Sequence, residues 1–192
     1  VDRVAAQSAR VLLLTPRDGH RFAQRLWAHE DSGLMLRADV LSPDGQVLES
    51  SAFTDIKVGV KPQPEAVLGA MHKLEGFRVV RAAITRTQLQ TEGWRLDVPV
   101  AGFQQISCVK RPIDGGDPKA GAPSMVQSIY SDGLVHISVF IEPYQAQRHQ
   151  PMMSSWGATH AVAQQRDQQW ITVMGDVPFD TIKKFAAALE KL

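Results

Sequence analysis

Residues 11–27, VLLLTPRDGHRFAQRLW, and residues 34–53, LMLRADVLSPDGQVLESSAF, share one design. Each segment begins with a run of residues that is apolar or that alternates between apolar and polar. A turn follows in which proline comes shortly before Asp-Gly, and a second run of the same kind follows the turn. Proline presets φ at the first corner, and Gly19 or Gly45 would supply the positive φ that other residues resist. Because such flanks are typical of strands, the two segments predict consecutive antiparallel hairpins.

The strands of these hairpins are expected at residues 10–15, 20–28, 34–41 and 46–58. They place the start of the chain inside a meander, and its first residues, VDRV, lack the charged and then apolar pattern of a signal peptide. We therefore expect the meander to be the last part of a larger sheet, with the earlier strands outside this sequence.

A linker is predicted at Lys61-Pro62-Gln63-Pro64, because two prolines remove backbone donors and stiffen the chain. Pro64 suits the first turn of a short helix that the apolar spacing extends to Leu74. The apolar stripe of that helix consists of Val67, Leu68, Met71 and Leu74. Residues 79–85 predict one more strand, and we place a domain boundary within residues 60–93.

The second region predicts several strands and a closing helix. The strands are expected at residues 104–111, 124–130, 134–142, 157–165 and 169–174. Ser131-Asp132-Gly133 predicts a third hairpin turn, and the Gly- and Pro-rich residues 114–121 predict a loop. After Pro178 we expect a helix whose apolar face packs across the sheet. That face comprises Phe179, Ile182, Phe185, Ala186 and Leu189. The predicted fold class is α+β, mainly antiparallel β with few helices.

The composition is that of an ordinary globular protein. The 192 residues are 44% apolar and 21% charged, which is enough for one core or two small ones. A formal net charge of +1 argues against a nucleic-acid-binding protein, which usually has a strongly basic face. Cys108 is the only cysteine, so the chain forms no internal disulfide, and we interpret Cys108 as a small buried strand residue.

No motif for catalysis, metal binding or cofactor binding is present. The six histidines form no H-E-x-x-H pattern, and the chain contains no G-x-S-x-G, P-loop or G-x-G-x-x-G motif. The sequence therefore predicts no enzyme, no catalytic residue, no metal site and no cofactor.

Apolar residues on both faces of the predicted strands leave two interpretations open. They could form a two-sided core, or one face could hold a lipid or acyl chain. For a lipid surface the candidates are Phe22, Leu26, Trp27 and Leu36. Arg21 and Arg25 share a strand face and could meet lipid phosphates, although a solvated strand edge has the same pattern.

A set of segments in constant order covers nearly the whole chain. They are VLLLTPRDG (11–19), LW (26–27), LMLRADVL (34–41), DGQVLE (44–49), GW (93–94), PVAGF (99–103), KRP (110–112), YSDGL (130–134), GAT (157–159) and VMGDVP (173–178). Together they resemble the periplasmic sigma-E regulatory proteins of the RseB/MucB family.

The resemblance implies a fold in three parts. Residues 1–60 would be the last strands of a large domain similar to the lipoprotein carrier LolA, a half-open antiparallel barrel. Residues 61–93 would be a linker with a short helix, and residues 94–192 a small C-terminal domain of sheet and helix.

The resemblance also implies a function without covalent chemistry. Such a protein would bind the periplasmic part of an anti-sigma factor of the RseA/MucA type and shield it from site-one proteolysis. Lipopolysaccharide or another lipid would release it, and the sigma-E envelope stress response would then begin. A periplasmic lipid or lipoprotein carrier of the LolA type is the alternative, and scattered His and Asp residues are the sole support for an enzyme.

Candidate residues for partner binding lie in the second region. They are Tyr130, Asp132 and Leu134 of the third hairpin, together with Lys110 and Arg111, since Tyr and Arg are enriched at binding hot spots. A core position for Tyr130, with Asp132 held by turn geometry alone, is the alternative. Unpaired strand edges also predict self-association of the chain as a homo-oligomer or a swapped sheet.

Overall fold

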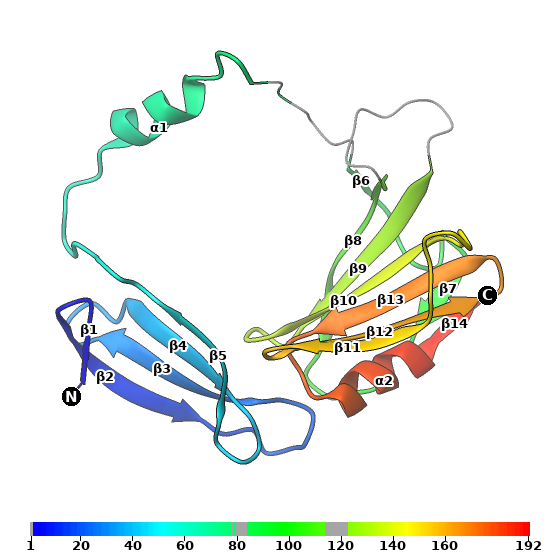
Figure 1. Ribbon diagram of the computed structural model, residues 1–192, viewed down its shortest axis with the longest axis horizontal. Helices are drawn as coiled ribbons and strands as arrows, with labels where there is room; N and C mark the ends of the chain where they lie inside the picture. The colour runs from blue at the N-terminus through cyan, green and yellow to red at the C-terminus, as the bar shows by residue number, and fades with distance from the viewer. Residues whose placement is uncertain (1, 78, 80–83, 114–122) are drawn as a thin grey trace.

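The computed structural model describes residues 2–77, 79, 84–113 and 123–192. Two antiparallel sheets lie next to each other, and helix α1, which lies between them in the chain, stands away from both (Figure 1). The predicted fold class, mainly antiparallel β with few helices, is confirmed. None of the helices in these described ranges is long and apolar enough to span a membrane.

The first sheet has the strand order β1-β2-β3-β4-β5. β1 spans Asp2–Val4, β2 Gln7–Leu14, β3 Ala23–His29, β4 Met35–Leu41 and β5 Val47–Ala52. The last four strands agree with the predicted meander, although β5 is shorter than expected. β1 was not predicted, because the turn before β2 uses Ala5 and Ala6 at positive φ, and alanine carries no turn signal.

The two Asp-Gly turns differ. Gly45 has a φ of +84° and donates its N–H to the Ser42 carbonyl at 2.9 Å, which confirms the tight turn predicted there. The prediction for Gly19 is wrong, because Gly19 does not have a positive φ and β2 and β3 are joined by the long loop 15–22. This loop extends to the second sheet instead of closing a tight hairpin.

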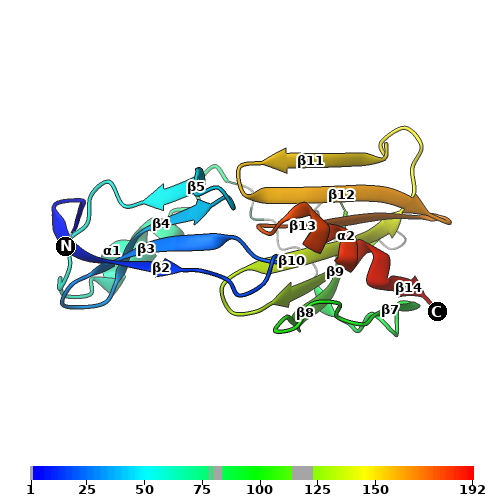
Figure 2. The ribbon, with the colours of Figure 1, turned by 90° about the horizontal axis from the view of Figure 1, so that it is seen from below.

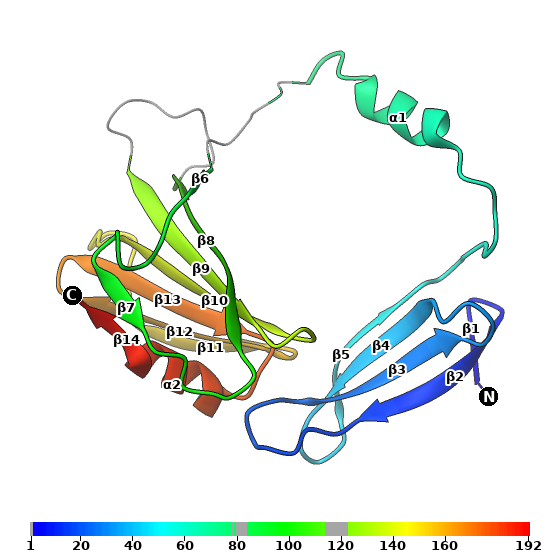
Figure 3. The ribbon, with the colours of Figure 1, turned by 180° about the vertical axis from the view of Figure 1, so that it is seen from behind.

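Helix α1 spans Pro64–His72, and proline lies in its first turn as predicted. Leu68, Met71 and Leu74 of the expected apolar stripe are exposed, and α1 stands apart from both sheets (Figure 3). Most of the strand predicted within residues 79–85 lies outside the described residues, and strand β6 follows at Thr85–Arg86.

The second sheet has the order β11-β12-β13-β10-β9-β8-β6. β8 spans Gln104–Pro112, β9 Ser124–Ser131, β10 His136–Pro143, β11 Met152–Trp156, β12 Thr159–Arg166 and β13 Gln169–Gly175. β11 was not predicted, because its sequence MMSSW does not alternate. The strand expected from residue 157 begins two residues later, since Gly157 (φ +57°) belongs to the turn between β11 and β12.

Helix α2, Phe179–Ala188, packs against β12 and β13 as predicted (Figure 2). Ile182 and Phe185 of α2 are fully buried, and the Phe185 ring meets the rings of Phe103 and Tyr130 edge-on, each at 5.5 Å between centroids. Arg166 donates to the Ala186 carbonyl at 3.1 Å, which satisfies one of the open carbonyls at the end of the helix. Strands β7 (Trp94–Leu96) and β14 (Leu189–Lys191) pair beside this core.

Candidate functional site

The loop 15–22 fastens the first sheet to the second mainly through Arg21. The Arg21 guanidinium donates from Nε to Asp132 Oδ2 at 2.6 Å and from Nη2 to the Ala101 carbonyl at 2.8 Å. A third bond runs from Nη1 to Asp18 of the same loop at 2.5 Å. The guanidinium also lies over the Phe103 ring at 4.9 Å. We call this arrangement the Arg21 latch.

Asp132 is held from both sides. Its side chain is only 9% exposed, and Oδ1 accepts the backbone N–H groups of Leu134 and Val135, both at 3.0 Å. Burial raises the pKa of the Asp132 carboxyl, but the hydrogen bonds from the Val135 amide, Arg21 and the Leu134 amide lower the pKa by more. The net pKa therefore lies below its usual value, and Asp132 stays ionised opposite Arg21.

A second set of contacts lies at the start of α2. Thr181, fully buried, donates its hydroxyl to the His20 carbonyl at 3.0 Å. The Phe22 ring lies 5.7 Å from the His160 ring, which stacks on Phe179 at 4.1 Å. The loop therefore ends in apolar packing against the second sheet as well as in an ion pair.

Two glycines allow the sheets to approach each other. A Cβ atom on Gly102 (φ +91°) would lie 2.9 Å from Arg21 Nη2. A Cβ atom on Gly157 would lie 3.0 Å from the Leu48 carbonyl oxygen, so the turn between β11 and β12 lies against β5. Both positions need glycine because of the close approach and the positive φ.

Between the sheets lies a groove of about 340 Å³, and a smaller hollow of about 110 Å³ beside the Arg21 latch shares the lining residues Gln24, Leu134 and Val135 with it. Leu26, Met35 and Val40 of the first sheet form one wall, and Leu134 and Val135 of the second sheet face them. Glu49 and Asp176 also line it, as does Asp39, whose fully buried carboxylate is paired with Arg37. The groove is therefore apolar along its walls and carries negative charge from Glu49 and Asp176, a combination that suits an extended peptide with apolar and basic side chains.

The residues predicted for lipid binding do not form one surface. Trp27 is buried and donates from its indole N–H to Asp2 at 2.8 Å, and Leu36 packs in the same small core. Phe22 is buried in the contact between the sheets, and Leu26 lines the groove.

The two arginines predicted to meet lipid phosphates are also separated. Arg21 is used by the latch, whereas the Arg25 guanidinium lies 6.0 Å from the Trp27 ring.

Of the residues predicted for partner binding, Asp132 and Leu134 lie at the site. Tyr130 is buried in the core against Phe185. Lys110 pairs with Glu92 at 2.8 Å, and this pair and Arg111 lie at the opposite end of the β8–β9 ladder. Arg111 is half-buried, and its Nε is without a hydrogen-bond partner among the described residues.

Sequence reasoning missed the groups that receive the loop, namely Ala101, Gly102 and Thr181. They lie about 80 to 160 residues from their partners in the chain, and no local pattern marks such contacts. In the part of the chain that the structure describes, no group of three His, Cys, Asp or Glu side chains could hold a metal ion. Burial raises the pKa of the Cys108 thiol, which disfavours the nucleophilic thiolate.

Acid should weaken the contact between the sheets through Asp132. Its pKa is lower in the folded chain than the usual value of about 4, so ionised Asp132 stabilises the fold above that value. The stabilisation is lost as the pH falls through the folded-state pKa. We expect the loss of melting temperature between pH 6 and pH 3 to be smaller for Asp132→Asn than for the wild type. Asp31→Asn, at an exposed loop position, is the control; an unchanged acid dependence in Asp132→Asn would contradict the assignment.

Comparison with known proteins gives consistent matches along the chain. The MucB/RseB N-terminal domain model matches residues 1–71, and the MucB/RseB C-terminal domain model matches residues 88–190. The sigma factor AlgU regulatory protein MucB of Pseudomonas aeruginosa is 33% identical over 97% of this chain. The sigma-E factor regulatory protein RseB of Escherichia coli is 26% identical over 96% of it.

Solved structures give the same result. A crystal structure of MucB in complex with MucA(peri) matches 99% of this chain and 64% of its own, with a TM-score of 0.72 and 29% identity. A crystal structure of MucB matches with a TM-score of 0.69 and 27% identity, covering 100% of this chain and 60% of its own. The chain spans 57% of the P. aeruginosa relative and 55% of the E. coli relative.

Proposed function

The chain belongs to the MucB/RseB family, and on this basis we propose that it binds the periplasmic part of a membrane-spanning anti-sigma factor in the groove between its two sheets. The groove carries the proposal, because its apolar walls face each other across the two sheets and its charged residues are acidic. A similar protein, MucB, has been solved in complex with MucA(peri), which supports a partner of this class.

The proposed role is negative regulation of the sigma-E envelope stress response in the periplasm. Bound to the anti-sigma factor, the chain would keep the partner's extended segment from site-one proteolysis. A lipid or lipopolysaccharide that prefers the unbound regulator would shift the population away from the complex. This role needs no enzymatic activity, since binding and release are sufficient.

We propose a domain organisation to match. The first domain comprises residues 1–60, residues 61–93 form a linker with helix α1, and the second domain comprises residues 94–192. Leu89 is buried in the core of the second sheet, which supports placing the start of the second domain a few residues earlier, near Leu89.

A lipid or lipoprotein carrier of the LolA type is the second candidate. Strand β2 exposes three apolar side chains, those of Val11, Leu12 and Leu13, and they lie on both faces of the first sheet. Exposed apolar surface of this kind favours the binding of apolar ligands such as acyl chains. The acidic groove favours it less, because carboxylates repel lipid phosphates.

Titration calorimetry with the periplasmic domain of a cognate MucA-type anti-sigma factor tests the proposal. Leu134, which is 65% exposed and lines the groove, is replaced by glutamate, and Ile106→Glu is the control because Ile106 is 64% exposed and does not line the groove. We expect Leu134→Glu to weaken binding at least tenfold, since it places a charge on an apolar wall beside carboxylates. Equal affinities for the two variants would contradict the site. No binding by the wild type, with acyl chains copurifying, would favour the carrier.

A further inference from the structure

The outer edges of the two sheets are protected to different degrees. In a sheet, an unpaired edge offers a row of N–H and C=O groups to another chain, and proteins usually block it with charges, proline, bulges or short strands. Among the described strands, β1 has three residues and two charges, and β6 has only two residues. β1 and β6 also occupy part of the outer edges of β2 and β8, and β8 is bulged between Gln105 and Ser107.

β11 has none of these protections. Its five residues, MMSSW, include no charge and no proline, and in the described structure β11 pairs only with β12. Met153 and Trp156 are 58% and 59% exposed. An uncharged edge with exposed methionine and tryptophan is typical of a surface that another chain covers.

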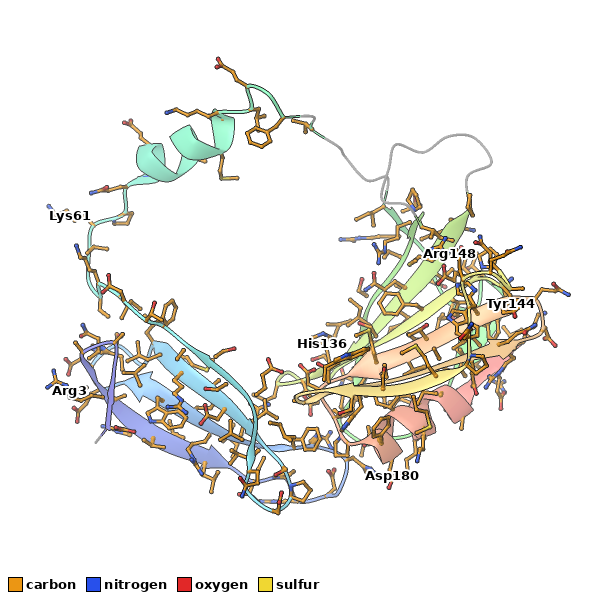
Figure 4. The ribbon with its side chains drawn as sticks, viewed as in Figure 1. Arg3, Lys61, His136, Tyr144, Arg148 and Asp180 are labelled. Atoms are coloured by element: carbon orange, nitrogen blue, oxygen red, sulfur yellow. The ribbon has the colours of Figure 1, made fainter. Side chains whose placement is uncertain are left out.

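The edge of β11 continues toward the groove. Figure 4 places Tyr144 and Arg148, which precede β11 in the chain, at the end of the second sheet away from the first sheet. β11 therefore runs toward the first sheet, and the turn that follows it lies against β5 at Leu48. Glu49 and Ser51 of β5 line the groove. β5 and β11 thus follow one another along the same margin of the molecule (Figure 2).

We infer that β11 accepts an extended segment of the anti-sigma partner as an added antiparallel or parallel strand, continuous with the part of the partner that occupies the groove. The inference rests on the proposed function and deepens it by assigning a second contact. A row of backbone donors and acceptors selects a polypeptide, because a lipid cannot satisfy it along its length. The exposed methionines and Trp156 would pack against alternate side chains of the added strand.

A second copy of the chain fits this edge less well. Pairing of two β11 strands uses five residues, or about 17 Å at about 3.4 Å per residue. Such a contact is small beside the roughly 1,200–2,000 Å² that stable interfaces bury. A longer partner segment gains the groove contacts in addition to those of β11.

The experiment combines calorimetry with amide hydrogen exchange, with the same anti-sigma periplasmic domain as the probe. Met153→Lys places a charge on the edge of β11. Leu13→Lys is the matched comparison, because Leu13 is 61% exposed on the part of β2 that β1 does not pair with. We expect Met153→Lys to weaken binding five- to twentyfold, Leu13→Lys to leave it within twofold, and the amides of residues 152–156 to gain protection in the wild-type complex.

The other outcomes separate the two proposals. If the wild type binds but the amides of β11 gain no protection, and Met153→Lys binds with unchanged affinity, the inference of an added strand is overturned. The proposed function would remain in place. A larger loss in Leu13→Lys would transfer the contact to β2 and overturn the inference. Protection of β11 that depends on the concentration of the chain alone would show a second copy there and overturn it too. No binding by the wild type would overturn both proposals.

Discussion

Replacement of Arg21 by alanine is expected to separate the two sheets in solution. The change removes the hydrogen bonds to Asp132 and Ala101 and the contact with the Phe103 ring. It also leaves the Asp132 carboxylate, 9% exposed, without its cation. Truncating one member of a buried, hydrogen-bonded charge pair typically costs about 2–5 kcal/mol, and we expect about 3 kcal/mol of the docking free energy to be lost.

Small-angle X-ray scattering and the rotational correlation times of the two sheets by nuclear magnetic resonance measure the result. We expect a larger radius of gyration for Arg21→Ala, with the two sheets tumbling separately. Arg17→Ala, at an exposed position of the same loop, should behave as the wild type. Arg21→Lys should lie between them, because lysine keeps the charge but loses the fork of donors. Unchanged scattering and tumbling in Arg21→Ala would show that the Arg21 latch does not hold the sheets together.

The second large effect is expected at Phe185 in α2. Its side chain is 0% exposed and packs edge-on against Phe103 and Tyr130. Phe185→Ala removes this packing and leaves a cavity that rigid strands on the other side cannot close. Replacing a buried phenylalanine by alanine lowers stability by about 3–5 kcal/mol. We expect the free energy of unfolding of the second sheet and its helix α2 to fall by this amount.

Urea denaturation followed by tryptophan fluorescence measures this loss. Phe77→Ala makes the same chemical change at a side chain that is 75% exposed, and it should change stability by no more than about 0.5 kcal/mol. A loss of unfolding free energy below about 1 kcal/mol in Phe185→Ala would mean that the packing of α2 against this sheet is not a main source of its stability.

Local patterns predicted much of the fold. Ser42-Pro43-Asp44-Gly45 predicted its turn because everything that this turn needs is in these four residues, and the apolar spacing after Pro178 predicted α2 and its buried face. The same pattern failed at Gly19, because the conformation of loop 15–22 is set by contacts with the second sheet. β11 was missed because its run of two methionines and two serines gives no apolar–polar alternation.

The site was predicted only in fragments. Arg21 was assigned to lipid phosphates and Asp132 to a partner protein, whereas the structure joins them in one ion pair. The two residues are 111 positions apart, and a single sequence carries no signal for a contact across that separation. Leu134 and Leu26 were each chosen as apolar residues with a binding role, and the groove between the sheets brings them together.

Photo-crosslinking from the groove tests the central proposal most directly. A benzophenone side chain is placed at Met35, an exposed residue that lines the groove, and in a separate protein at Ile106, which does not line it. With the periplasmic domain of a MucA-type anti-sigma factor, we predict a crosslink to the partner from position 35 and none from position 106. Saturable binding without a crosslink at position 35, or equal crosslinking from both positions, would contradict the groove as the binding site.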